Sequence, residues 1–339
     1  MAAYTTIDDP SAFFKCQLYT GTGSSNAITF NDTDTDMQPD LVWCKQRSSP
    51  AASSALVNSV TGVDKFMASN ASTAEVDDAY NVTAFGSDGF TVGASSGSAD
   101  INVSSETYVA WCWKESATAG FDIVAMEGTG SARTQAHSLS AIPHWMTVKS
   151  RDDNDNWFVY HRGNTSAPET DKLKLDETGG TADDNTIWND TAPTSSVFTV
   201  GTTNGVNKDD SNFIAYLWTS IQGFSHVGSY SGNGNADGIF VYTGFSPQYI
   251  LIKKNEATKS WYIRDTKRNP RNGPTSLFLV TEGTDIEYSG AHMDVDFLSN
   301  GFKCRNADNA QNANATSYIY MAFADAPLVN SEGVPCNAK

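Results

Sequence analysis

The sequence lacks the features that mark membrane, secreted and nucleic-acid-binding proteins. No apolar run approaches roughly 18 residues, and Met1–Asp9 has neither the basic nor the apolar region of a signal peptide. Lys and Arg number 22 against 39 Asp and Glu, a formal net charge of −17, so the chain has no basic excess to attract nucleic acid or an anionic membrane. We therefore expect a chain made in the cytoplasm that neither inserts into a membrane nor binds nucleic acid.

Cysteine is scarce and poorly spaced for a structural role. The five cysteines are odd in number and form no C-x-x-C pair, which predicts neither a disulfide framework nor a zinc site. Cys44 and Cys112 stand at positions that are apolar elsewhere in the chain's internal repeats, so we expect them to act as small core residues.

Recognisable catalytic motifs are also missing. The five histidines form no H-E-x-x-H, and G-x-S-x-G does not occur. Carboxylates are plentiful, so the sequence does not exclude a glycosidase, but no pair stands out. No catalytic, cofactor-binding or metal-binding residue is predicted, and no cofactor.

Three short charged segments resemble sites only superficially. Asp32, Asp34 and Asp36 begin like a calcium loop, but Met37 replaces the turn glycine and Trp43 replaces the bidentate glutamate. The stretch 152–156 and the basic cluster 267–271 are short runs of charge. All three are predicted to be solvated polar loops.

The chain contains an internal sequence repeat that occurs three times. Strand-like hexapeptides Tyr108–Trp113, Phe213–Trp218 and Tyr318–Phe323 begin 105 residues apart. Apolar runs that open on proline and close on lysine recur at intervals of 104, and these are Pro39 to Lys45, Pro143 to Lys149 and Pro247 to Lys253. Repeats of this length indicate tandem domains, because solenoid units are only about 20–50 residues long.

Further columns follow the same register. Gly-x-Gly recurs at Gly21/Gly23, Gly128/Gly130 and Gly232/Gly234, and a phenylalanine precedes each hexapeptide at Phe90, Phe198 and Phe302. Trp157 and Trp261 form a column that the first copy fills only with the stretch 52–56. The Gly-x-Gly elements lack a following helix, so we interpret them as turns and not as phosphate-binding loops.

The repeats predict an N-terminal arm (1–14), three domains (15–116, 121–222 and 225–326) and a C-terminal tail (327–339). The short linkers 115–120 and 220–224 predict domains that touch. The sequence allows packing around a common axis or in a line.

The residue pattern predicts an all-β fold. Positions two, four and six of each hexapeptide are large, such as Val109, Trp111 and Trp113, while Ala110 and Ala215 lie on the alternate face. This alternation indicates strands whose bulky face is in the core. With turns at short intervals, the prediction is three tandem β-sandwich domains of about 104 residues, of jelly-roll or concanavalin-like type. Strand order is not predicted.

The chain resembles a family of tandem-domain virion proteins of tailed bacteriophages, especially phages of marine bacteria and cyanobacteria. The resemblance covers nearly the whole chain, and its clearest motifs are Tyr19–Gly23, Gln38–Trp43, Phe85–Gly93, Thr191–Gly201, Gly228–Gly234 and Tyr318–Ala324. It implies a tail-fibre-like or other structural protein of the particle and brings no catalytic residues.

The sequence and the resemblance lead us to expect a non-enzymatic bacteriophage structural protein, located in the virion and exposed on its surface, with a tail-fibre-like role in host adhesion. A capsid decoration or head-fibre role remains open, because no fibrous repeat is present. A glycan-binding lectin or a polysaccharide depolymerase is the alternative from another class. Expected partners are other virion proteins of the tail or capsid and a host-surface glycan or receptor, and a homo-oligomer remains open.

Overall fold

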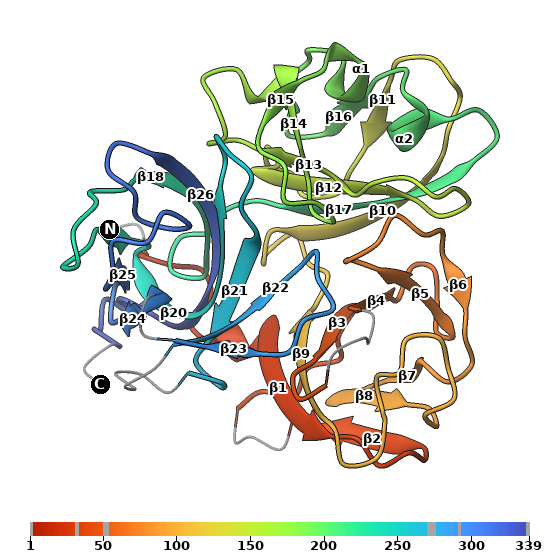
Figure 1. Ribbon diagram of the computed structural model, residues 1–339, viewed down its shortest axis with the longest axis horizontal. Helices are drawn as coiled ribbons and strands as arrows, with labels where there is room; N and C mark the ends of the chain where they lie inside the picture. The colour runs from red at the N-terminus through yellow and green to blue at the C-terminus, as the bar shows by residue number, and fades with distance from the viewer. Residues whose placement is uncertain (1–2, 31–33, 50–53, 270–275, 291–292, 337–339) are drawn as a thin grey trace.

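The computed structural model describes residues 3–30, 34–49, 54–269, 276–290 and 293–336, and these form an all-β protein. Three lobes surround a common centre (Figure 1), in chain order red to orange, yellow to green, and cyan to blue. Each lobe is a β-sandwich that pairs a six-stranded sheet with a smaller one. Among the described residues, no helix is long and apolar enough to cross a bilayer.

The first sandwich follows a short 3₁₀ turn, η1 (Pro10–Ala12). Its large sheet contains, in spatial order, β1 (Phe14–Thr20), β9 (Thr107–Trp113), β3 (Leu41–Gln46), β4 (Ala55–Asn58), β5 (Lys65–Ala68) and β6 (Val76–Asp77). Its small sheet contains β2 (Asn26–Thr29), β8 (Gly89–Val92) and β7 (Val82–Gly86).

The second sandwich adds two short helices. Its large sheet contains β10 (Phe121–Glu127), β17 (Asn212–Trp218), β12 (Trp145–Ser150), β13 (Phe158–His161), β14 (Asp171–Lys174) and β15 (Ala182–Asp183). Its small sheet is β11 (Arg133–Ala136) with β16 (Val197–Val200), and the helical elements are η2 (Pro168–Thr170), α1 (Asn185–Trp188) and α2 (Asn204–Asn207).

The third sandwich repeats the pattern with longer central strands. Its large sheet contains β18 (Ser225–Ser231), β26 (Ser317–Pro327), β20 (Phe245–Lys254), β21 (Trp261–Asp265), β22 (Leu277–Val280) and β23 (Tyr288–Ser289). Its small sheet contains β19 (Phe240–Tyr242), β25 (Gly301–Cys304) and β24 (Val295–Leu298).

The three large sheets share one strand order and one register. The proline-led strand pairs antiparallel with the hexapeptide strand in each, and Leu41 faces Trp113, Trp145 faces Trp218, and Tyr249 faces Phe323. The prediction of three tandem β-sandwiches is therefore confirmed. Pro39 and Pro143 precede their strands by two residues, whereas Pro247 lies inside β20 at a register shift. Proline cannot donate to a ladder, so such an irregular position suits it.

The bulky face of each hexapeptide is buried, as predicted, but against the other repeats and not inside its own sandwich. Val109, Trp111 and Trp113 belong to a hydrophobic cluster that draws residues from all three repeats. The alternate face, with Ala110 and Cys112, packs inside the first sandwich. In the first repeat, Ala110 and Cys112 thus leave room for the facing sheet, while the large side chains fill the centre of the molecule.

The shared core is rich in aromatic rings. Trp113 lies 6.0 Å from Trp218, 5.6 Å from Phe323 and 5.9 Å from Tyr249, between ring centroids in edge-to-face contacts. A cavity of about 20 Å³ remains among residues of all three repeats, with an almost entirely apolar lining. A space of this size and polarity is a packing gap that stays dry. The repeats therefore pack around a common axis.

The Gly-x-Gly elements are turns in all three repeats. The second glycine of each has a left-handed backbone, with φ of 74° at Gly23 and 67° at Gly130 and Gly234. A Cβ on Gly128 would lie 2.0 Å from the carbonyl oxygen of Lys208, so that position needs glycine for close approach.

The two chain termini lie against the third repeat. The Tyr4 hydroxyl donates to the carbonyl of Gly244 at 2.7 Å, and the backbone N–H of Ser331 donates to Asp8 at 2.6 Å. The described part of the predicted arm is thus tied to the body by hydrogen bonds, and Figure 1 shows both ends on the same lobe.

Candidate functional site

The three interfaces between repeats, called seams below, share one backbone hydrogen bond. The donor is the N–H of the residue just before an edge strand (β6, β15 or β23). The acceptor is the carbonyl of the residue just after the strand that contains or follows the repeated proline (β3, β12 or β20). The pairs are Glu75 with Arg151 at 2.8 Å, Glu287 with Arg47 at 2.9 Å, and Thr181 with Asn255 at 2.7 Å. Repeat 2 therefore contacts the edge of repeat 1, repeat 1 that of repeat 3, and repeat 3 that of repeat 2. Such head-to-tail contacts close a ring and cover the sheet edges.

The side chains make one seam different from the other two. Arg151 binds Glu75 through two hydrogen bonds, of 2.7 and 3.0 Å, and Arg47 binds Glu287 in the same way at 2.9 and 3.0 Å. The seam between repeats 2 and 3 has Thr181 and Asn255 at these positions and so carries no equivalent ion pair. The backbone bond is retained there, and the Asn255 side chain donates to the carbonyl of Asn164 at 2.5 Å.

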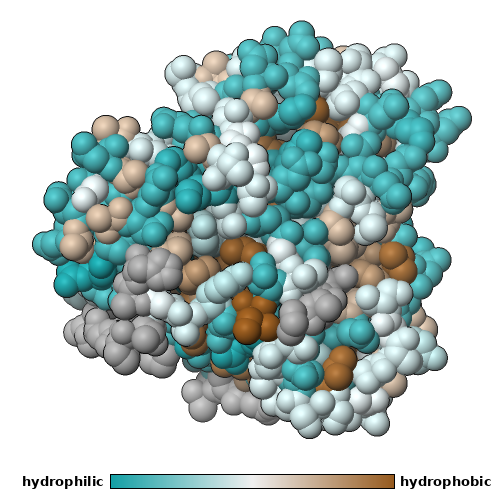
Figure 2. All heavy atoms as spheres, in the orientation of Figure 1, coloured by the Kyte–Doolittle hydropathy of each residue, from teal (hydrophilic) through white to brown (hydrophobic). Residues whose placement is uncertain are grey.

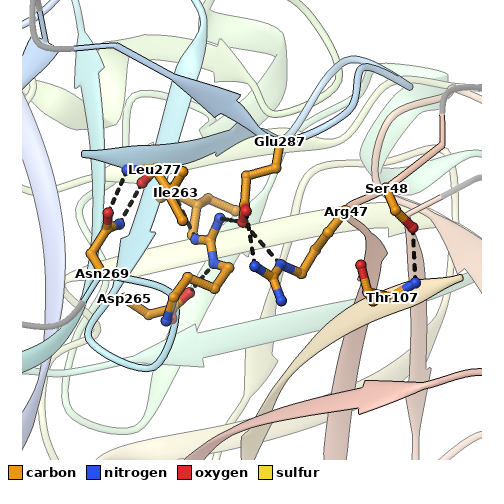
Figure 3. Close-up of polar contacts among 9 residues, drawn as sticks. Arg47, Ser48, Thr107, Ile263, Asp265, Asn269, Leu277 and Glu287 are labelled. Carbon is orange, nitrogen blue, oxygen red and sulfur yellow. Dashed lines mark hydrogen bonds and ion pairs between the residues drawn. The ribbon is translucent and has the colours of Figure 1, made fainter. Parts of the chain in front are cut away.

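Figure 3 shows that the seam between repeats 1 and 3 extends into a buried charge network. Arg268 is fully buried and binds Asp265 at 2.5 Å and Glu287 at 3.1 Å. Asp265 also accepts the indole N–H of Trp111 at 3.1 Å. The prediction of a solvated loop at 267–271 is thus wrong for Arg268, because Asp265 at the end of β21 and Glu287 just before β23 neutralise its charge in the interior. Residues 270 and 271 lie outside the described residues.

A buried lysine is the next-to-last residue of each of the strands β3, β12 and β20. Burial is the main cause that lowers the pKa of Lys45, Lys149 and Lys253 to about 8. The Lys45 ammonium donates across its seam to the carbonyl of Gly283 at 2.6 Å, and that of Lys253 donates to Thr178 at 2.8 Å. Lys45 and Lys253 therefore hold loops of the neighbouring repeat in place, whereas Lys149 donates to the carbonyls of Ser150 and Asp153 in its own repeat, at 2.7 and 3.2 Å.

One position in the large sheet, opposite Leu41, Trp145 or Tyr249, carries a different polar residue in each repeat: Asn58, His161 and Asp265. The side chain of each makes a hydrogen-bond contact with a neighbouring repeat. His161 accepts the backbone N–H of Gly163 at Nδ1 and so places its proton on Nε2, which faces the carbonyl of Tyr320 at 3.2 Å. Burial is the main cause that lowers the pKa of His161 to about 4.

Two more histidines flank this seam. Burial and the charge of Arg162 lower the pKa of His144 to about 4 and also lower that of His226. His226 Nδ1 lies 2.7 Å from the Tyr320 hydroxyl. The neutral histidines thus belong to the packing between repeats 2 and 3.

A groove of about 580 Å³ opens beside this same seam. Tyr262 and Phe278 of repeat 3 form aromatic walls together with Tyr288, and Thr178 comes from repeat 2. Glu282 and Asp285 bring carboxylates into the lining. The volume lies within the range of about 300–1,000 Å³ typical of small-ligand sites, which favour domain interfaces.

The aromatic wall of the groove is held by a stack of side chains. The Tyr288 ring lies parallel to the Phe278 ring with centroids 5.2 Å apart, and Tyr262 meets Phe278 edge to face at 5.5 Å. The guanidinium of Arg264, fully buried, lies 5.2 Å from the Phe278 centroid. Tyr288 stays 40% exposed, so its ring remains accessible at the rim.

The acidic segments noted in the sequence do not form a metal centre among the described residues, which contain no cluster of three potential metal ligands. Asp153 pairs with Lys208, and Asp152 accepts the backbone N–H of Asn212 at 2.8 Å, so these carboxylates fix turns. Asp32 and His292 lie outside the described residues. Cys44 and Cys112 are buried in the first sandwich, as expected.

One carboxyl group has a pKa suited to proton transfer. Burial, with a hydrogen bond to Asp122, raises the pKa of Glu115 to about 7. It lies in the linker between repeats 1 and 2, and its side chain accepts the backbone N–H of Ile123 at 3.2 Å. Glu115 does not line the groove beside the third repeat.

Sequence reasoning missed the groove and one structural column. Asn102, Asn207 and Asn312 are buried and each accepts the N–H of the middle residue of a Gly-x-Gly turn. Their spacing of 105 residues could have revealed them. The groove had no such signal, because the positions equivalent to Tyr288 carry Val76 and Ala182 in the other repeats, and Thr178 comes from repeat 2.

Residues 9–327 match the model of a family described as a domain of unknown function (DUF7483). The match spans most of the chain, so the protein belongs to this family. No curated protein matches the chain.

Proposed function

We propose that this DUF7483 protein is a non-enzymatic structural component of a bacteriophage particle, exposed on the virion surface and serving tail-fibre-like adhesion to the host. The observation that carries the proposal is the closed ring of three equivalent sandwiches in one chain. The sequence resemblance to tailed-phage virion proteins points in the same direction.

A ring of three repeats suits a threefold or quasi-threefold attachment point. A true trimer offers three identical contacts, whereas one chain offers three equivalent positions that can differ in sequence. The seams already show this freedom, since two carry an Arg–Glu pair and the third carries Asn255 and Thr181. One face can therefore engage the particle while individual loops diverge to contact the host.

The exposed surface supports a role in polar contacts. Figure 2 shows a face that is mostly hydrophilic, with apolar groups confined to small patches. Large exposed apolar side chains are scattered over the described chain, from Val60 and Tyr80 to Ile142 and Phe240. Scattered apolar residues of this kind are normal for a protein surface.

A capsid decoration or head-fibre protein is the second candidate. The compact ring favours it, because all three sandwiches share one core and no shaft extends from the described residues. Both roles place the protein on the particle, and they differ in whether it sits on the head or the tail.

The direct test is mass spectrometry of purified virions followed by immunogold labelling. We expect the chain in mature particles with label at the tail, and label over the head would favour decoration. Absence of the chain from purified particles would refute a virion role altogether.

A further inference from the structure

We propose that the groove beside the third repeat binds a neutral saccharide, with Tyr288 as the stacking surface and Asp285 and Glu282 as acceptors for sugar hydroxyls. This inference deepens the proposed adhesion function and rests on it for its biological setting. The site requires more than one repeat, since Thr178 of repeat 2 forms part of its wall.

The aromatic groups have the placement that a sugar ring requires. The C–H face of a sugar packs on an exposed, rigid aromatic ring. Tyr288 supplies such a ring because Phe278 supports it from one side at 5.2 Å while it remains 40% exposed. Phe278 is itself fixed by Arg264 and Tyr262. The platform is therefore preorganised, which reduces the entropy lost on binding.

The polar groups favour a ligand without negative charge. The lining has two carboxylates, from Glu282 and Asp285, and contains no lysine, arginine or histidine among the described residues. An anionic sugar would meet like charge here, in a chain whose net charge is already −17.

A cationic ligand fits less well than a neutral one. One oxygen of Glu282 already accepts the backbone N–H of Trp261 at 3.2 Å, and the opposite charge of Lys45 lies close enough to interact with this carboxylate. Part of its charge is thus compensated from within the protein. Its remaining acceptor capacity suits hydroxyl donors.

The groove is anchored by all three repeats. The backbone of Gly283, in its lining, is fixed by the Lys45 ammonium of repeat 1 at 2.6 Å, and the Thr178 carbonyl of repeat 2 accepts from Lys253 at 2.8 Å. A single isolated sandwich would lack these anchors. The site therefore depends on the ring, which links binding to the architecture.

The test is an array of neutral, amino and sialylated or sulfated oligosaccharides probed with the full chain, followed by calorimetry with the strongest neutral oligosaccharide. Tyr288→Ala is expected to weaken binding at least tenfold, whereas Tyr288→Phe keeps the ring and most of the affinity. Tyr80→Ala removes a tyrosine of similar exposure, 47% against 40%, from repeat 1 and should leave binding unchanged. Far-UV circular dichroism of each variant verifies the fold.

Three results would overturn the assignment. They are no binding of neutral oligosaccharide at millimolar concentration, binding that Tyr288→Ala leaves intact, and selective binding of anionic or amino sugars. Release of reducing ends from a bound glycan would refute the non-enzymatic role instead. Loss of glycan binding by a chain still found in virions would leave the structural function standing, so the two proposals fail separately.

Discussion

Protonation of His161 should weaken the seam between repeats 2 and 3 in mild acid. In the folded protein both ring nitrogens are committed, because Nδ1 accepts from Gly163 and Nε2 faces the carbonyl of Tyr320. A second proton on Nδ1 would face the N–H of Gly163 and break that hydrogen bond. The neutral ring is therefore the form that the fold stabilises.

The size of the effect follows from linkage. The pKa of His161 is lowered from 6.5 to about 4, so the unfolded chain binds the proton first as the pH falls. The stabilisation is present above pH 6.5 and is lost as the pH falls towards 4, where the loss reaches about 3 kcal/mol. Between pH 7 and pH 5 the same relation gives a loss of about 2 kcal/mol.

Urea unfolding of the wild type and of His161→Gln at pH 7 and pH 5 measures this loss. Glutamine retains a donor near the position of Nε2 but cannot be protonated, so the variant should be less stable at pH 7 by about 1–2 kcal/mol. At pH 5 that gap should close or reverse.

The comparison between variants is essential because Glu115 acts in the opposite direction. Its pKa is raised to about 7, so the folded chain binds its proton first and gains stability as the pH falls from 7. This contribution is common to both proteins and cancels in their difference. A gap between the wild type and His161→Gln that stays constant from pH 7 to pH 5 would refute the reasoning.

Two further predictions concern stability, measured by chemical denaturation. Asp265→Asn leaves the buried Arg268 without its closest carboxylate and should lower the free energy of unfolding by about 3–5 kcal/mol. The control Asp77→Asn, at a site 84% exposed, should lower it by less than about 1 kcal/mol. Equal losses in the two variants would contradict the buried network. Gly128→Ala places a methyl group 2.0 Å from a carbonyl oxygen and should destabilise the chain by about 1–3 kcal/mol. The control Gly179→Ala, with nothing within 4 Å of the added Cβ, should change stability by less than about 0.5 kcal/mol. If Gly128→Ala left stability unchanged, the turn would not be closely packed.

The sequence alone determined the elements that depend on local or repeated signals. Alternation and the 105-residue spacing located the hexapeptide strands, and they anticipated the burial of Trp111 and Trp113. The Gly-x-Gly pattern identified turns because left-handed backbone and close approach both select glycine. Each of these features is encoded by a few adjacent residues and occurs in all three repeats, so the strands and turns could be predicted without knowledge of the fold.

Tertiary structure decided what those surfaces meet. Alternation shows that Trp113 is buried but cannot show that its neighbours are Trp218 and Phe323 of other repeats. The sequence predicted that Arg268 lies in a solvated basic loop, yet its side chain is buried and binds Asp265 and Glu287.

The groove is the clearest case of a feature that no local pattern encodes. It needs Thr178 beside Tyr288, two residues that come from different repeats and are brought together only when repeats 2 and 3 pack against each other. Contacts across the seams depend on how three sheets pack against one another, and that packing is set by the combined shape of side chains far apart in sequence. Ring closure, and the site it creates, are therefore properties of the folded chain as a whole.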